Sequence, residues 1–237
     1  MSELNDLILD LITLGFLLPS IILGFIIGFK SYGTYKKNKN FQNEIFTIMA
    51  FSLSIAVILL ISEQIFLTLV VNIQLGLFFG AVATITSGIV VVTTDAFAFS
   101  MVFTKKYKIL TIISTIFMSM PVLLHIFDPT KTVEEGEIVF YWDPLQIGLP
   151  ITPLVMFCVI IPLLIIPVLT FYYYSIKIRN KSKVRSKRAL VLGTGILLIS
   201  LAYIFELIGL PVIVVFLRSM FLMGGILIYY AMFKIKE

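Results

Sequence analysis

Four ionisable side chains lie inside long apolar segments of the chain, where a charge needs a specific reason to be present. They are Glu63, Asp95, Glu206 and Arg218. A charged group near the centre of a bilayer is costly, so such residues are rare and face protein or water. Arg218 follows a short turn after the segment that holds Glu206, and we expect the two side chains to pair across adjacent antiparallel helices. The pair would form either the floor of an outward-facing ligand cavity, with Glu63 at a similar depth, or a structural ion pair that fixes helix register.

Asp95 is the deepest acid in the sequence. Counted from Lys105, it lies about 15 Å inside its apolar segment, at 1.5 Å of rise per helical residue. The acid is expected to be a proton or ion site or the pivot of a switch. The alternatives are a carboxyl group that is protonated, paired with a lysine at the inner edge, or hydrogen-bonded to neighbouring hydroxyls. The hydroxyl candidates are Thr93, Thr94 and Ser100.

His125 and Trp142 are each unique in the chain. His125 lies just before the longest polar segment, 128–148, and Trp142 lies within it. One histidine beside one carboxylate, Asp128, is a poor metal site, so no metal is expected. His125 is either a pH-sensing group or an interfacial residue without a special role. The aromatic run that ends at Trp142 is either a lid over the cavity mouth or part of an interfacial aromatic belt.

The segments that carry these residues are apolar enough to require lipid. Of the 237 residues, 59% are hydrophobic and 13% are charged, against about 45–50% and about 25% in soluble domains. A spanning helix needs about 20 apolar residues. We therefore predict an all-α membrane protein, a single domain over residues 1–237 with seven transmembrane helices. The predicted spans are about 8–29, 44–69, 77–103, 109–127, 151–176, 189–208 and 212–233.

The positions of the basic residues predict the orientation. Nearly all of the 18 Lys and Arg residues fall in alternate turns, near 30–39, 105–108 and 177–188, and at the C-terminus. By the positive-inside rule these regions are cytoplasmic, which places the N-terminus outside and the protein in the cell membrane as a multi-pass chain. The same turns would meet anionic lipid headgroups, so the net charge of +5 gives no reason to expect nucleic-acid binding.

Several motifs together resemble the seven-helix membrane sensor domain that begins many prokaryotic histidine kinases. Glu63 lies near the outer end of the second span, and the segment 99–105, Phe-Ser-Met-Val-Phe-Thr-Lys, closes the third. His125 follows the fourth, a basic turn at 185–192 precedes the sixth, and 224–230 is a glycine-bearing, tyrosine-rich stretch. Because only four residues follow Phe233, we expect no kinase domain in this chain. The resemblance implies a stand-alone sensor module that signals through a separate partner.

The sequence thus leaves several functional hypotheses. The first is a receptor-like sensor that binds a small polar ligand in an outward-facing cavity lined by Glu63, Glu206 and Arg218 and contacts a signalling partner through the loop 177–188. The second is a small transporter or channel that uses Asp95 and the outer glutamates as a proton or cation relay. The third is a membrane subunit that only scaffolds a complex, and a homo-oligomer is left open. Catalysis is not expected, because no nucleophile–base pair, metal set or cofactor motif is apparent.

Overall fold

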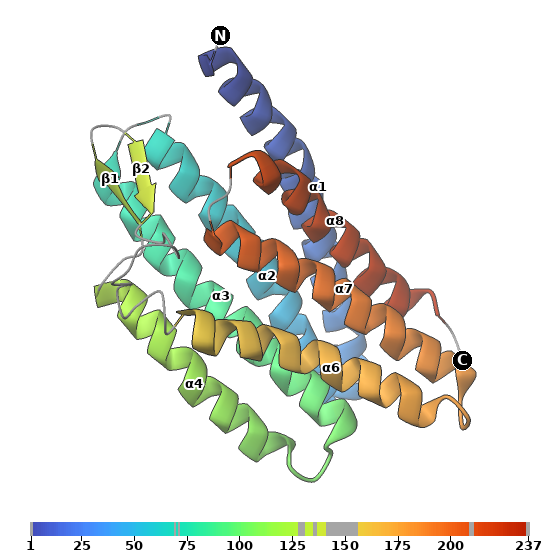
Figure 1. Cartoon of the computed structure of the whole chain (residues 1–237). Helices are drawn as coiled ribbons and strands as arrows, with labels where there is room; N and C mark the ends of the chain where they lie inside the picture. The colour runs from blue at the N-terminus through green and yellow to red at the C-terminus, as the bar shows by residue number, and fades with distance from the viewer. Residues whose placement is uncertain are drawn as a thin grey trace.

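The computed structural model describes residues 2–68, 70, 72–127, 131–134, 137–140, 156–208 and 211–235. Within these residues the chain forms seven α-helices, one π-helical turn and one short hairpin (Figure 1). The elements, in chain order, are α1 Ser2–Asn38, α2 Phe41–Thr68, α3 Ile73–Val102, α4 Tyr107–Phe127, β1 Lys131–Glu134, β2 Glu137–Phe140, η1 Met156–Ile160, α6 Ile161–Ile178, α7 Lys183–Ile208 and α8 Pro211–Phe233.

The predicted all-α fold class is confirmed, and the helices have the character of membrane spans. Six of the described helices are long and apolar enough to cross a bilayer, whereas the apolar segment found in α8, Arg218–Phe233, is shorter than these six. Large apolar side chains point away from the bundle along these helices, as at Ile112 and Ile116 of α4, which are 58% and 59% exposed. Apolar surface on this scale is consistent with contact to a lipid bilayer.

The polar segment 128–148 holds an antiparallel hairpin that the sequence did not predict. Strand β1 pairs with β2 so that Lys131 lies opposite Phe140 and Glu134 opposite Glu137. The two strands are four residues each. Such short strands, next to a turn and among charged residues, have too little hydrophobic alternation to be recognised in advance.

Helix ends follow local capping and not hydropathy alone. Helix α1 runs past the predicted span end at residue 29, through Lys30 to Asn38, and Lys39 then adopts a positive φ of 40° that turns the chain into α2. Between α2 and α3, the side chain of Asn72 accepts a hydrogen bond from the backbone N–H of Leu75 and caps the new helix. Hydropathy reports where lipid contact ends, whereas the hydrogen-bonded helix continues into the interface.

The described part of the fifth predicted span, 156–176, contains two kinds of helix. A π-helical turn, η1, precedes α6, and Pro162 is the second residue of α6. Proline is tolerated there because the first backbone N–H groups of a helix have no intrahelical partner. Pro167 lies inside α6 and is fully buried, where neighbouring helices compensate for the interrupted ladder.

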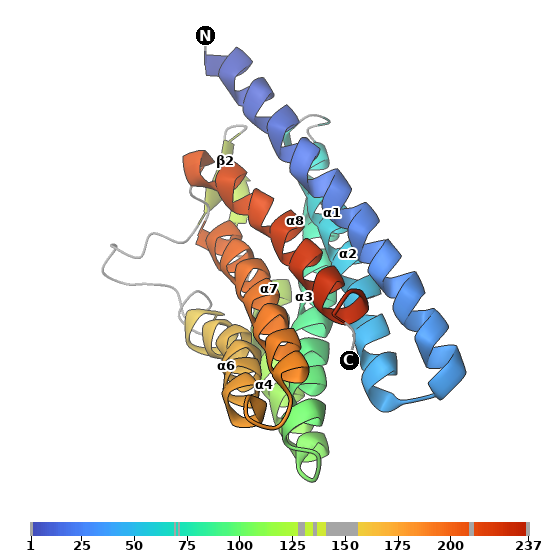
Figure 2. The same ribbon diagram turned by 90° about the vertical axis from the view of Figure 1, so that its right-hand side faces the viewer.

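Near one end of the bundle, helix α3 is surrounded by other helices. It contacts α2, α4 and α6, and all eight residues from 93 to 100 are buried. Helix α8 lies between α1 and α7, whereas α4 lies at the edge against α3 and η1 (Figures 1 and 2). The α1–α2, α3–α4 and α6–α7 turns share one end of the bundle (Figure 1), which we call the basic end because of its lysines and arginines.

Close glycine packing joins α7 to α8. A Cβ atom built on Gly195 would lie 2.9 Å from the carbonyl oxygen of Gly224, and one built on Gly224 would lie 2.7 Å from the carbonyl oxygen of Gly195. Neither backbone can yield without moving its helix. Between lipid-embedded helices, where apolar burial gives little drive to associate, small residues let backbones approach and gain dispersion contacts.

Lysine and aromatic side chains mark the basic end. The ammonium of Lys30 on α1 hydrogen-bonds the hydroxyl of Tyr229 on α8 and lies 4.6 Å from the centroid of that ring. Near the same end, Arg188 of α7 donates to the backbone carbonyl of Met232, in the last turn of α8, at 3.1 Å. Cations next to aromatic rings and helix C-termini are typical of a membrane–water interface.

Candidate functional site

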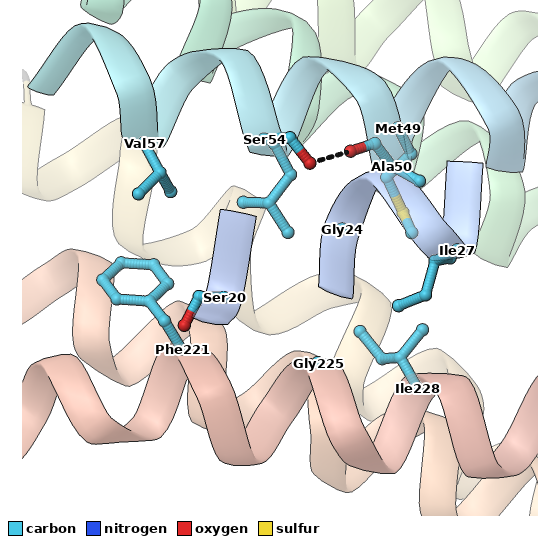
Figure 3. A pocket seen from close by; sticks show the side chains of 11 residues that line it. Ser20, Gly24, Ile27, Met49, Ala50, Ser54, Val57, Phe221, Gly225 and Ile228 are labelled. Atoms are coloured by element: carbon cyan, nitrogen blue, oxygen red, sulfur yellow. Dashed lines mark hydrogen bonds between the residues drawn. The ribbon is translucent and has the colours of Figure 1, made fainter. Parts of the chain in front are cut away.

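A small cavity lies between α1, α2 and α8 of the bundle. Its volume is about 30 Å³. Figure 3 shows its walls: Ser20, Gly24 and Ile27 come from α1, Phe221, Gly225 and Ile228 from α8, and Met49, Ala50, Ser54 and Val57 from α2. Leu53 of α2 also lines this cavity. The Ser54 hydroxyl turns back to the carbonyl of Ala50, so it presents little polarity to the interior.

Two further cavities of about 40 Å³ each adjoin the first. One reaches α6 and α7, with Leu164, Pro167 and Ile196 in its wall. The other lies against α3 and α7, with Ser87 and Tyr203 in its wall. Leu53 lines all three cavities. The three volumes therefore meet around one side chain, at the junction of six helices.

Glu63 lies on α2, beyond the cavities in the direction away from the basic end. It is three residues past Leu60, the last α2 residue that lines a cavity, or about 4.5 Å along the helix, and is 3% exposed. Its carboxylate rests against Gly80 of α3, where an added Cβ would lie 2.8 Å from the carboxyl carbon. Glycine at position 80 thus makes the space that this acid occupies. Glu63 was predicted from the sequence as a site residue, whereas Gly80 was not.

Arg218 lies at a similar level on α8. It is three residues before the cavity residue Phe221, about 4.5 Å along the helix, and is 8% exposed. The backbone of Glu206 belongs to α7, but its side chain is outside the described residues, so the predicted Glu206–Arg218 pair stays a prediction. Both residues are buried on the side of the cavities away from the basic end, and we refer to these two side chains together as the charged layer. Neither residue lines any of the three cavities.

Asp95 is fully buried at the interface between α3 and α4. Its Oδ2 atom accepts a hydrogen bond from the hydroxyl of Ser114, and among the described residues its Oδ1 atom has no hydrogen-bond partner. The hydroxyls of Thr93 and Thr94 bond to carbonyls one turn back on α3, each at 2.7 Å, and Ser100 bonds to Phe97 at 2.8 Å. The hydroxyl that meets Asp95 therefore comes from the neighbouring helix, and sequence proximity pointed to the wrong ones.

The side chains of the remaining predicted site residues, His125 and Trp142, lie outside the described residues. His125 belongs to α4 by its backbone, but its side chain is outside the described residues. Trp142 is outside them altogether. Within the described part of the chain, no group of three or more His, Cys, Asp or Glu side chains is arranged to hold a metal ion. The arrangement that remains is an apolar interior cavity system, a buried charged layer beyond it and a separate buried acid.

Comparison with known proteins gives no significant match: no family model, no curated protein and no solved structure matches the chain.

Proposed function

We propose that this protein is a receptor-like sensor of the cell membrane, in which a small ligand bound inside the helix bundle alters the basic end. The observation that carries the proposal is the set of three adjoining cavities at the junction of α1, α2, α3, α6, α7 and α8. Protein interiors are close-packed and contain few voids. Several voids around one side chain are a natural place for a ligand whose binding changes helix packing.

Helices α6 and α7 provide a route from the cavities to the basic end. Leu164 and Ile196 line a cavity, and both helices continue to the turn that joins them. Between cavity and turn, the Tyr172 and Thr194 hydroxyls lie 3.2 Å apart, and the Ser175 hydroxyl donates to the carbonyl of Ser186 at 2.8 Å. These bonds join α6 and α7 into one unit, so a shift at the cavity would move their turn.

We also propose how the bundle is oriented in the membrane and where a partner protein contacts it. All seven helices cross the membrane, the basic end faces the cytoplasm, and a separate protein contacts the loop 177–188. The placement of Lys and Arg supports this orientation, and the resemblance to histidine-kinase sensor domains supports signalling through a partner. The charged layer of Glu63 and Arg218, together with Glu206, would then close the three cavities on the outer side.

Sensing requires a ligand with different affinity for two states of the bundle. We expect spin labels at Lys106→Cys and Lys181→Cys, in a Cys158→Ser background, to report a changed distance when a stabilising compound binds. Candidate compounds come from a thermal-shift screen of metabolites on the purified protein. The same compounds applied to Glu206→Gln test whether the outer layer takes part. Compounds that bind and stabilise without changing the label distance would contradict sensing.

Buried Asp95 supports a second candidate, a transporter or channel for protons or small cations. A carboxyl group that is fully buried, with one oxygen lacking a hydrogen-bond partner among the described residues, is a typical component of an intramembrane proton or ion pathway. Proton or cation flux into proteoliposomes that falls at least about tenfold in Asp95→Asn, about 1.4 kcal/mol in barrier terms, would favour transport. Equal flux in the variant and the parent would exclude this role for Asp95.

A further inference from the structure

The three cavities have a common wall that can open. Leu53 lines each of them and is only partly buried, because its side chain faces space on several sides. Leucine changes rotamer by rotation about two side-chain bonds. Such a rotation would join neighbouring cavities without moving a helix. Leu53 therefore divides one chamber into compartments.

The chamber offers a ligand almost no hydrogen-bond donors. No described lining residue is charged. Four of the lining hydroxyls donate to main-chain carbonyls: Ser20 to Phe16, Ser54 to Ala50, Thr94 to Val90 and Ser200 to Leu164. The other two, Ser87 and Tyr203, hydrogen-bond each other. A ligand that needs hydrogen-bond donors would lose its hydration here without replacement, which is unfavourable.

The size of the chamber limits the ligand. Each compartment measures about 30 to 40 Å³, enough for a water-sized object. In other proteins, dry cavities of about 150 Å³ lined by aliphatic and aromatic side chains bind benzene or xenon. A ligand of a few carbon atoms therefore fits once Leu53 turns aside and compartments join.

We infer that Leu53 gates a single apolar chamber whose ligand is a small uncharged hydrocarbon-like molecule that arrives through the lipid. This inference rests on the proposed sensor function, for which it names the ligand class. The charged layer of Glu63 and Arg218 lies outside the chamber and would contact the ligand only indirectly. An apolar molecule partitions into the bilayer, so its local concentration around the bundle is high.

A short-chain alkyl diazirine, photoactivated on the purified full-length protein in lipid nanodiscs, tests the chamber directly. We expect saturable labelling of the cavity residues of α2, α6 and α7, competed by excess unlabelled alkane. Leu53→Trp, which fills the chamber, should lower this labelling at least tenfold. Leu53→Ala, which joins the compartments, should raise it. Ile55→Trp and Ile55→Ala are the matched controls, since Ile55 lies two residues along α2, is 44% exposed and lines none of the three cavities.

Labelling confined to outward-facing residues and unchanged in both Leu53 variants would overturn the inference. A polar compound that stabilises the protein equally well in Leu53→Trp would overturn the apolar ligand class while leaving the sensor function standing. Saturable labelling of the chamber with no change in the distance between labels at 106 and 181 would support the chamber and contradict the sensor function. If Leu53→Trp does not fold, Leu53→Phe and Leu53→Ala give the same comparison.

Discussion

Replacing Gly195 with leucine is expected to separate α7 from α8 and to prevent recovery of a folded, monodisperse protein in mild detergent. The Cβ of any larger residue would lie 2.9 Å from the carbonyl oxygen of Gly224 and 3.3 Å from the backbone nitrogen of Ile228. Backbone atoms cannot rotate away as a side chain can. Overpacking costs about 1–3 kcal/mol in well-packed cores, and occasionally more. We place Gly195→Ala at about 3 kcal/mol and Gly195→Leu beyond it.

Gly225→Ala is the matched control, because its added Cβ would meet only the end of the Leu23 side chain, at 3.0 Å. That side chain can move, and alanine favours the helix by up to about 1 kcal/mol relative to glycine. Thermal unfolding of fluorescent fusions, followed by size-exclusion chromatography, measures both variants. Equal melting temperatures for Gly195→Ala and Gly225→Ala would show that the backbone of α8 does not prevent a larger residue at position 195.

Replacing Asp95 with alanine is expected to loosen α4, which lies at the edge of the bundle. Among the described residues, the Asp95–Ser114 hydrogen bond is the polar link between α3 and α4 that the structure shows. Interhelical hydrogen bonds in membranes average about 0.6 kcal/mol and reach about 1.7 kcal/mol. The variant also leaves a small cavity, so we expect a total loss of about 2 kcal/mol in the free energy of unfolding.

A double-mutant cycle separates the hydrogen bond from the cavity. Ser114→Ala alone should cost less than Asp95→Ala, and the double variant should cost less than the sum, because both changes remove the same bond. Ser119→Ala on α4 is the control: its hydroxyl is exposed and bonds to the carbonyl of Ile116 on its own helix. Fully additive effects of Asp95→Ala and Ser114→Ala would mean that the two side chains do not interact in the folded protein.

The helices were predictable from the sequence because lipid imposes a length and a composition on each of them. Unbroken apolar segments of about 20 residues have few other structures available. Asp95 and Glu63 were recognised for the same reason, since charges stand out within such segments, and the structure finds both buried. Amino-acid composition therefore predicts the fold class and shows which residues are unusual within the apolar segments.

The contacts between helices were not predictable, because a helix that is apolar on every side has no periodicity that marks its buried face. Leu53 and Ile55 look equivalent in the sequence, yet one lines three cavities and the other is exposed. Ser114 resembles the other hydroxyls of α4, but it alone among them bonds to Asp95 in the described structure. The small residues offered the best available signal, since Gly80, Gly195 and Gly224 all lie at close contacts.

Membrane-impermeant maleimide labelling of single cysteines in intact cells tests most directly whether this bundle spans the membrane with its basic end inside. In a Cys158→Ser background, Asn72→Cys in the α2–α3 turn should react in intact cells. Lys181→Cys in the α6–α7 turn should react only after the cells are opened. Both positions are exposed in the structure, so access depends on the membrane alone. Labelling of Lys181→Cys in intact cells, with Asn72→Cys protected, would reverse the orientation, and equal labelling of both would contradict a spanning bundle.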